Sequence, residues 1–276
     1  MAMRIQITKE DFEQSILVAT SSHSEVFESV EPHFVEAYNM IQQRFLGYVG
    51  EEALETSERL SAAVVKAVCL SAFLEVVRHL DLVLTPTGFG VVANNEVSPA
   101  SSARVEALVE QCRVAYLKAE GEMITWLSAT SGWGSSLQAK MCLPLLVFSI
   151  GQYAFQVKQE LTSKQWNEKL AALYEADAVM RKLISDEQMD DLLEMERGAK
   201  AKDDTAVELI FKVRRCMIFQ AEGLLTAFST ERGRLLRYLD ANIDKFQLYA
   251  DSSAYKANHF KEYQNGKEKP AFVFNS

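Results

Sequence analysis

The sequence predicts a mainly α-helical protein with helix bundles, one small β-hairpin and an extended C-terminal tail. Long segments repeat apolar residues at the three- and four-residue spacing of amphipathic helices. Glycine and proline are scarce, with 12 and 5 among 276 residues, which disfavours an all-β chain. The one long interruption, residues 81–104, has the composition of a hairpin followed by a turn. The hairpin is therefore expected at about 82–93.

Local signals place the helices of the N-terminal half. Thr8 and Asp11 have the spacing of a capping box, and Pro32 suits the first turn of a helix. Gly47 is expected to end that second helix. The second half of residues 51–80 is apolar around most of its circumference, so this helix should lie at the centre of the core. The expected helices cover residues 9–18, 31–47, 51–80 and 99–128.

The hairpin is predicted from turn chemistry between two short runs of β-forming residues. Residues 82–84 form the first run, and Phe89 and Val91 belong to the second. Pro86 and Gly88 lie between the runs, where a turn needs a fixed or a positive φ. The simpler interpretation is a surface connection between two helices, but its large apolar residues would then need burial, either locally or against a partner.

The C-terminal half continues the helical pattern after a break at residues 131–136, which is a candidate domain boundary. The expected regions are an N-terminal helical region with the hairpin, a second helical bundle and the tail. They cover residues 1–130, 131–250 and 251–276. The expected helices of the second half cover residues 137–160, 163–184, 186–200, 204–229 and 230–250.

No residue in the sequence is assigned a catalytic, cofactor-binding or metal-binding role. The four cysteines lie far apart in apolar helical segments, which favours buried reduced thiols over a zinc site. The four histidines have no metal-ligand spacing. Asp190, Asp191 and Glu194, or Asp203 with Asp204, could be drawn as metal ligands, but a solvated helix face and a helix N-cap explain them more simply.

The overall charge of −9 argues against a surface dedicated to nucleic acid. A group of cations with aromatic neighbours nevertheless leaves two interpretations open: weak, non-specific DNA contact, or a packed helix with cationic outer positions. This group consists of Lys212, Arg214, Arg215, Arg232, Arg234 and Arg237.

The chain contains no segment that reads as a membrane element. The N-terminus lacks the apolar stretch of a signal peptide, and the longest apolar run, residues 141–150, is far shorter than the ~20 residues that cross a bilayer. We therefore expect a soluble chain, made in the cytoplasm, without a membrane partner.

The tail ends in an apolar segment, Phe272, Val273 and Phe274, after a polar stretch. Apolar residues in such a position gain stability only when they dock. Docking on the parent chain and docking on a neighbour both remain open, and an extended segment of this kind suits a sheet edge or a groove.

The segment from Val65 to Arg104 carries a family resemblance. It contains a helix ending in EVVRHLDLVL, then TPTGFGVV, then NNEV and PASSARVEAL. This pattern resembles a group of helical head–tail connector-like proteins encoded by phages and prophages of the Bacteroidetes. The resemblance covers about residues 30–130 and, more loosely, the C-terminus. Residues 137–250 depart from the smaller connector proteins, so ring size and neighbours do not transfer directly.

The resemblance implies a non-enzymatic structural protein of the virion neck, made in the bacterial host cytoplasm. It implies a homo-oligomeric ring, twelvefold in the expected case, that contacts portal and tail proteins through the hairpin and the tail. No cofactor is implied. The partner-binding residues under this hypothesis are Leu84, Pro86, Gly88, Phe89, Val91, Phe272, Val273 and Phe274.

Two other classes of function remain open from the sequence. A helical scaffold or regulatory adaptor outside the virion, monomeric or dimeric, would pack the tail on its own body. An enzyme of an unfamiliar helical class would need a deep polar pocket with converging His, Asp or Glu residues, which no spacing in the sequence indicates.

Overall fold

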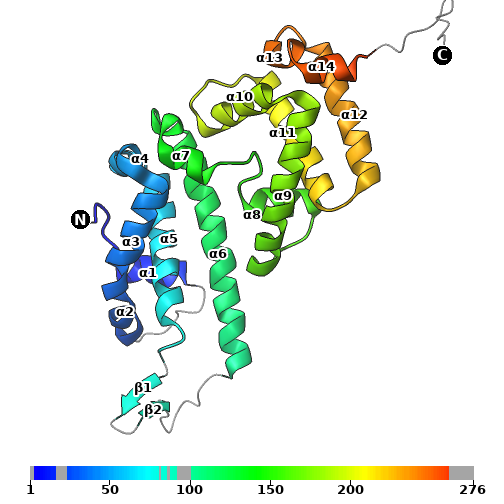
Figure 1. The fold of residues 1–276 in the computed structure, drawn as a ribbon. Coiled ribbons are helices and arrows are strands. Elements are labelled where there is room, and N and C mark those ends of the chain that lie inside the picture. The colour runs from blue at the N-terminus through cyan, green and yellow to red at the C-terminus, as the bar shows by residue number, and fades with distance from the viewer. Residues whose placement is uncertain (1–2, 17–23, 81, 86–87, 92–100, 261–276) are drawn as a thin grey trace, which may run out of the picture.

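The computed structural model describes residues 3–16, 24–80, 82–85, 88–91 and 101–260, and it is mainly helical, as predicted (Figure 1). The helices form two lobes joined by a strap, residues 143–149. The N-terminal lobe contains α1 (Lys9–Ser15), α2 (Ser24–Val30), η1 (Glu31–His33), α3 (Phe34–Ile41), η2 (Gln42–Leu46), α4 (Gly47–Ala53), α5 (Glu58–Val76), α6 (Ser102–Ser128), η3 (Trp133–Ser135) and α7 (Leu137–Cys142). The C-terminal lobe contains α8 (Ile150–Val157), α9 (Ser163–Ile184), α10 (Asp186–Arg197), α11 (Asp204–Ala221), α12 (Leu225–Ala241), α13 (Gln247–Ala250) and α14 (Ser253–Asn258).

Helix α5 is the centre of the N-terminal lobe, as its apolar circumference predicted. It packs against α1 and α3 on one side and along α6 on the other (Figure 1). Its buried residues include Val64, Val68 and Phe73. The ring of Phe73 also meets that of Phe12 from α1, with ring centroids 6.1 Å apart. The predicted capping box of α1 is confirmed, although α1 ends at Ser15 and not near residue 18.

One predicted boundary in the N-terminal lobe is confirmed and another is wrong. Gly47 is the C-cap that ends the π-helix η2, with a φ of +57°, and α4 follows as a separate helix. The central helix begins at Glu58 and not at residue 51. Ser57 is its N-cap, because its hydroxyl accepts the backbone N–H of Leu60 at 3.3 Å.

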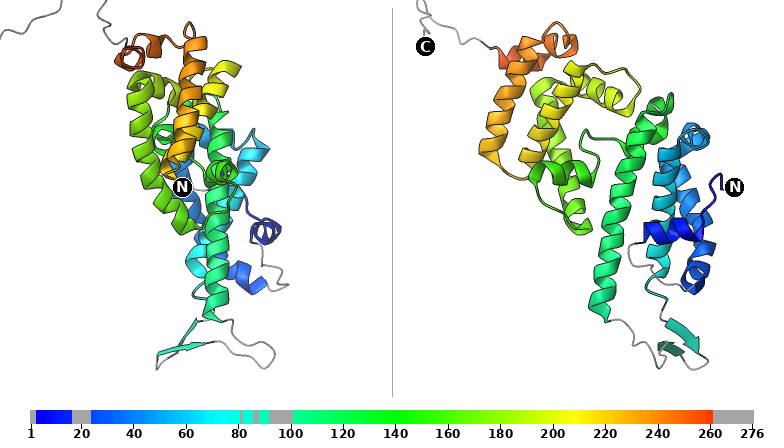
Figure 2. Two further views of the ribbon diagram at one scale, coloured as in Figure 1. Left: turned by 90° about the vertical axis from the view of Figure 1, so that its right-hand side faces the viewer. Right: turned by 180° about the vertical axis from the view of Figure 1, so that it is seen from behind.

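The segment predicted as a hairpin contains two four-residue strands, β1 (Leu82–Thr85) and β2 (Gly88–Val91). They pair antiparallel, with Leu84 opposite Phe89 and Leu82 opposite Val91. The connecting residues 86–87 and the stretch 92–100 lie outside the described residues. In Figures 1 and 2 the strand pair projects beyond the ends of α5 and α6.

The predicted helix over residues 137–160 is wrong, because the strap interrupts it. Pro144 has no N–H to donate and disfavours helical torsions at the residue before it. Leu143 accordingly has φ −124° and ψ 66°, and α8 starts afresh with Ser149 as its N-cap. The strap is apolar and buried, so it is a core element that links the lobes. Its fully or almost fully buried residues are Leu143, Leu145, Leu146 and Val147.

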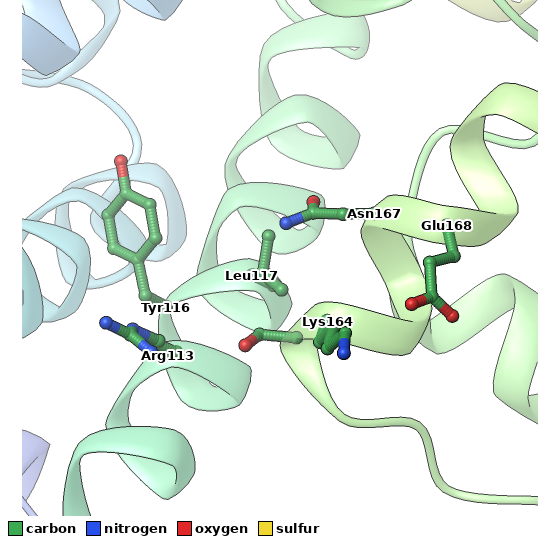
Figure 3. Close-up of a pocket in the computed structure, with 7 residues that line it drawn as sticks. Arg113, Tyr116, Leu117, Lys164, Asn167 and Glu168 are labelled. Carbon is green, nitrogen blue, oxygen red and sulfur yellow. The ribbon is translucent and has the colours of Figure 1, made fainter. Parts of the chain in front are cut away.

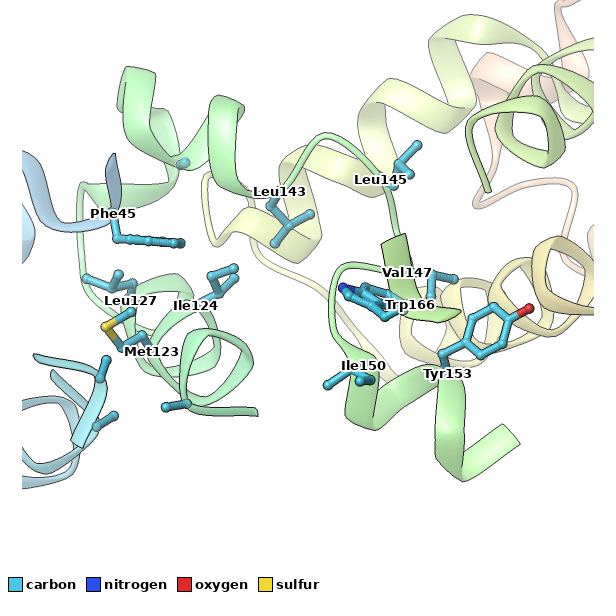
Figure 4. Packing of buried hydrophobic residues seen from close by; sticks show 14 of the residues in the cluster. Phe45, Met123, Ile124, Leu127, Leu143, Leu145, Val147, Ile150, Tyr153 and Trp166 are labelled. Atoms are coloured by element: carbon cyan, nitrogen blue, oxygen red, sulfur yellow. The ribbon is translucent and has the colours of Figure 1, made fainter. Parts of the chain in front are cut away.

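Buried residues of both lobes form one continuous hydrophobic cluster (Figure 4). In Figure 4, Met123, Ile124 and Leu127 of α6 lie to the left of Leu143 of the strap, and Trp166 and Tyr153 lie to its right. The rings of Tyr153 and Trp166 meet edge to face, with centroids 5.9 Å apart. The two lobes therefore share a core.

In the C-terminal lobe, one predicted helix is confirmed along its whole length, and another is divided into two helices. Helix α9 covers residues 163–184, as predicted. The predicted helix over 204–229 is wrong, because the chain turns at Gly223, whose φ is +69°, and α12 starts at Leu225. The tail expected from residue 251 also begins later, since residues 253–258 form α14.

Candidate interaction surfaces

The strand register places the apolar positions of the hairpin on one face. Residues directly opposite in an antiparallel pair share a face, as do alternate residues along a strand. Leu84 opposes Phe89 and Leu82 opposes Val91, so these four positions share one face of the ribbon. Val83, Thr85, Gly88 and Gly90 occupy the other.

The structure describes only part of the predicted partner-binding set. Leu84, Gly88, Phe89 and Val91 lie in the paired strands. Pro86 lies outside the described residues, as do all three apolar residues of the tail, Phe272, Val273 and Phe274. The hairpin and α14, the last described helix, lie at opposite ends of the molecule (Figures 1 and 2).

A π-helix in the N-terminal lobe is held by side chains from the chain segment that includes α7. The wider turn of η2 and the positive φ of Gly47 interrupt the usual pattern of backbone bonding. Three successive carbonyls of this region accept hydrogen bonds from side chains instead. The pairs are Gln138 Nε2 to the Gln43 oxygen at 3.4 Å, Cys142 Sγ to the Arg44 oxygen at 2.9 Å, and Trp133 Nε1 to the Phe45 oxygen at 2.8 Å.

The acidic residues considered as metal ligands are paired with cations. Asp190 lies 2.8 Å from Arg181, and Lys200 bridges Asp191 at 2.6 Å and Glu194 at 2.8 Å. Asp203 caps α11, accepting the N–H of Ala206 at 2.8 Å, which confirms the N-cap interpretation. Within the described residues, no group of three or more His, Cys, Asp or Glu side chains is arranged to hold a metal ion.

Most of the basic group predicted on the C-terminal half is engaged by carboxylates or carbonyls. Arg214 pairs with Glu196 and donates from Nε to the Leu146 carbonyl of the strap at 2.8 Å. Arg215 and Arg234 both pair with Glu231, at 3.2 and 2.6 Å. Lys212 pairs with Glu208 at 3.1 Å. In the described chain, only Arg232 and Arg237 of this group make no ion pair.

A pocket of about 630 Å³ lies between α6 and α9 (Figure 3). Figure 3 shows Arg113 and Tyr116 on the α6 side and Lys164 and Asn167 on the α9 side. The N-terminus of α9 beside this pocket is already occupied. The Glu110 carboxylate accepts the Ser163 backbone N–H at 2.5 Å and its hydroxyl at 2.7 Å. The local carboxylate therefore uses the donors that would otherwise attract an external anion.

Glu120 of α6 is a largely buried carboxylate whose pKa departs from its ordinary value. Burial raises its pKa, while Arg44 and the Tyr116 hydroxyl oppose the rise. The Arg44 guanidinium is 3.7 Å away, and the Glu120 side chain is only 16% exposed. Burial also raises the pKa of the nearby Cys142 thiol to about 12, so this thiol is protonated at neutral pH.

The remaining thiols agree with the sequence-based expectation. All four cysteines are free, and Cys69, Cys112 and Cys216 are buried. Burial raises the pKa of Cys69 and Cys216 to about 12 and that of Cys112 to about 11. None of the four has the low pKa of a reactive nucleophile.

Two exposed apolar surfaces were not predicted. Leu137 and Met141 are four residues apart on α7, and Tyr48 stands on α4; all three are more than 60% exposed. Leu224 and Leu225 are exposed at the turn between α11 and α12. The surface of Leu224 and Leu225 could have been found in the sequence, since two leucines directly after a turn glycine cannot both face a helix core. The surface of Leu137, Met141 and Tyr48 depends on the relative placement of α4 and α7, which the sequence does not show.

Comparison with known proteins adds one family. Residues 37–141 match the profile of a family of unknown function, DUF6712. The matched region begins within α3 and ends within α7, so it includes the hairpin, the π-helix, and Trp133 and Gln138, which bind two of its carbonyls, but not Cys142. No significant match was found among curated proteins or among solved structures. No described helix has the combined length and hydropathy of a membrane span.

Proposed function

We propose that this chain is a non-enzymatic structural protein of a virion, a head–tail connector or adaptor that acts through protein–protein contacts. The observation that carries the proposal is the hairpin. Its register places Leu82, Leu84, Phe89 and Val91 on one face, and it projects beyond the ends of α5 and α6. A strand pair that projects beyond its helices and has apolar residues in its sequence is suited to docking on another subunit.

A closed ring of identical subunits needs two different, complementary faces on each copy. The hairpin lies at one end of the molecule and α14, which leads into the C-terminal segment, lies at the other (Figure 2). This separation supports heterologous contacts in which the two ends meet different neighbours. The portal and the tail proteins are the proposed neighbours, and the virion neck is the proposed location.

The charge distribution supports protein contact over nucleic-acid contact. Arg214 pairs with Glu196, and Arg215 and Arg234 share Glu231, so carboxylates offset a large part of the positive charge of that group. DNA passing through such a ring would meet at most a weak, non-specific attraction. No cofactor is part of the proposal.

Labelling of intact particles tests this function directly. Virions of a phage that carries the gene are purified and labelled with an antibody against the chain, and the labels are located by electron microscopy. We expect labels at the junction between capsid and tail, and the chain among the proteins of the particle. Absence of the chain from purified virions, with the protein present only in the infected cell, would favour the scaffold or adaptor hypothesis.

A further inference from the structure

The turn between α11 and α12 forms an apolar groove of about 750 Å³. Leu225 is 68% exposed and Leu224 is 49% exposed, and Phe219 and Ala227 also line the groove. Two neighbouring leucines in this state lose the free energy that burial would provide. Adding a side chain at Gly223 would meet no atom within 4 Å, so the groove is open at the turn.

The two charged residues that line the groove, Arg215 and Glu231, form an ion pair with each other, although the Arg215 Nε has no hydrogen-bond partner. The Arg215 guanidinium lies 5.7 and 5.6 Å from the ring centroids of Phe211 and Phe219. It also lies 3.2 Å from Glu231, which Arg234 contacts at 2.6 Å. A ligand anion would have to compete with Glu231 for these cations. The groove therefore suits an uncharged, apolar occupant.

The described chain ends at the opposite end of α12 from this groove. The His259 imidazole lies 3.1 Å from Asp240, in the last turn of α12, and Asn258 donates to the Leu183 carbonyl at 2.9 Å. The groove begins at Leu225. The rise between residues 225 and 240 along a helix is about 23 Å.

The segment beyond Phe260 has the length and composition to cover that distance. Residues 261–270 are polar, and residues 271–276, AFVFNS, carry no charge. The 12 residues from Phe260 to Phe272 span at most about 40 Å when extended. As a flexible chain, a linker of that length has a typical end-to-end distance of about 19 Å. The apolar segment can therefore reach the groove of its own chain without full extension.

We propose that residues 271–274 dock in the α11–α12 groove of the same chain in the unassembled protein. A short linker gives the segment a millimolar effective concentration at its own groove, which exceeds that of any neighbour in dilute solution. The groove is thus the receptor for the tail and keeps its phenylalanines covered. This inference does not depend on the proposed virion function.

Disulfide trapping in the full chain tests the proposal. Leu225→Cys and Val273→Cys are combined in a Cys142→Ser background, and the protein is oxidised at low micromolar concentration with oxidised glutathione. Val35→Cys with Val273→Cys is the matched control, because Val35 is 46% exposed on α3, on the far side of α6 (Figure 1). We expect an intramolecular disulfide to form at least about tenfold faster in the first variant.

Equal rates in the two variants would overturn the proposal, as would disulfide-linked dimers as the main product of the first variant. A second measurement leaves the groove intact. Phe272→Asp with Phe274→Asp should accelerate backbone hydrogen exchange within residues 223–230 of the full chain, because the cover is removed. Unchanged exchange there would also contradict docking.

Discussion

The Trp133 indole N–H donates a hydrogen bond of 2.8 Å to the Phe45 carbonyl, 88 residues earlier in the chain. Trp133 is fully buried, and its acceptor belongs to the π-helix η2. This bond joins the turn after α6 to the helical segment that precedes α4. It shows that Trp133, within a segment that looks like a break in the sequence, is part of the core.

Substitution of Trp133 by Phe should destabilise the protein by about 2–4 kcal/mol, because it leaves the Phe45 carbonyl without its donor and opens a cavity. Chemical denaturation gives the free energy of unfolding. Trp126→Phe is the control, since Trp126 is only partly buried and lies under the Arg59 guanidinium at 4.9 Å. An equal loss in both variants would contradict the role assigned to the buried bond.

Glu110 joins the lobes at the start of α9, and we expect Glu110→Gln to cost about 1–3 kcal/mol of unfolding free energy. The amide can no longer accept both the Ser163 N–H and its hydroxyl with a charged group at the helix N-terminus. Glu106→Gln, one turn earlier, removes an exposed ion pair with Arg78 and should cost under about 1 kcal/mol. If the two variants lose the same unfolding free energy, the contact of Glu110 with Ser163 does not stabilise the packing of the two lobes.

Substitutions at Gly198 and Gly223 distinguish two causes of lost stability, backbone strain and steric clash. Both have a positive φ, +82° and +69°. A Cβ at Gly198 would lie 1.9 Å from the Ser128 carbonyl oxygen, whereas one at Gly223 would meet nothing within 4 Å. We expect Gly223→Ala to cost about 1 kcal/mol and Gly198→Ala several times more. Thermal melting curves of the two variants would reveal the ranking, and a reversed order would refute this packing.

Glu120 should make stability depend on pH. Its folded pKa lies above the ordinary value of 4.5, so near and above that pH the folded state binds more protons than the unfolded state. This contribution to stability is present below pH 4.5 and is lost as the pH rises through the folded pKa. The Glu120→Gln variant has no carboxyl group to titrate at this position, so it does not lose this stability as the pH rises. The free energy of unfolding of the variant should therefore increase relative to that of wild type from pH 4 to pH 7. A constant difference across this range would contradict a raised pKa.

Local signals in the sequence predicted those features of the fold that depend on neighbouring residues. The capping box of Thr8 and Asp11 and the whole of α9 follow from spacing within one segment. The C-cap at Gly47 was also predicted, but the turn at Gly223 was not. Both glycines take a positive φ, so glycine alone does not show which helix ends there and which continues.

The buried strap shows the same limit. The sequence predicted one helix over residues 137–160, and only the structure shows Arg197 and Arg214 donating to the Leu143 and Leu146 carbonyls of the strap. Those long-range partners replace the hydrogen bonds that a helix would have supplied. The hairpin positions were named from turn chemistry and the family resemblance, and the strand register then placed Leu84, Phe89 and Val91 on one face and Gly88 on the other.

The native mass of the purified full chain, measured by light scattering after size exclusion, tests the proposed assembly most directly. The chain has a mass of 31.0 kDa, so a twelvefold ring would have a mass of about 372 kDa. We expect the mass to rise toward that of a ring as the concentration increases. Phe89→Asp should block the rise, because it puts a charge on the apolar face of the hairpin, whereas Val83→Asp, on the other face, should not. A mass of one chain at every concentration, or equal assembly of the two variants, would contradict the account.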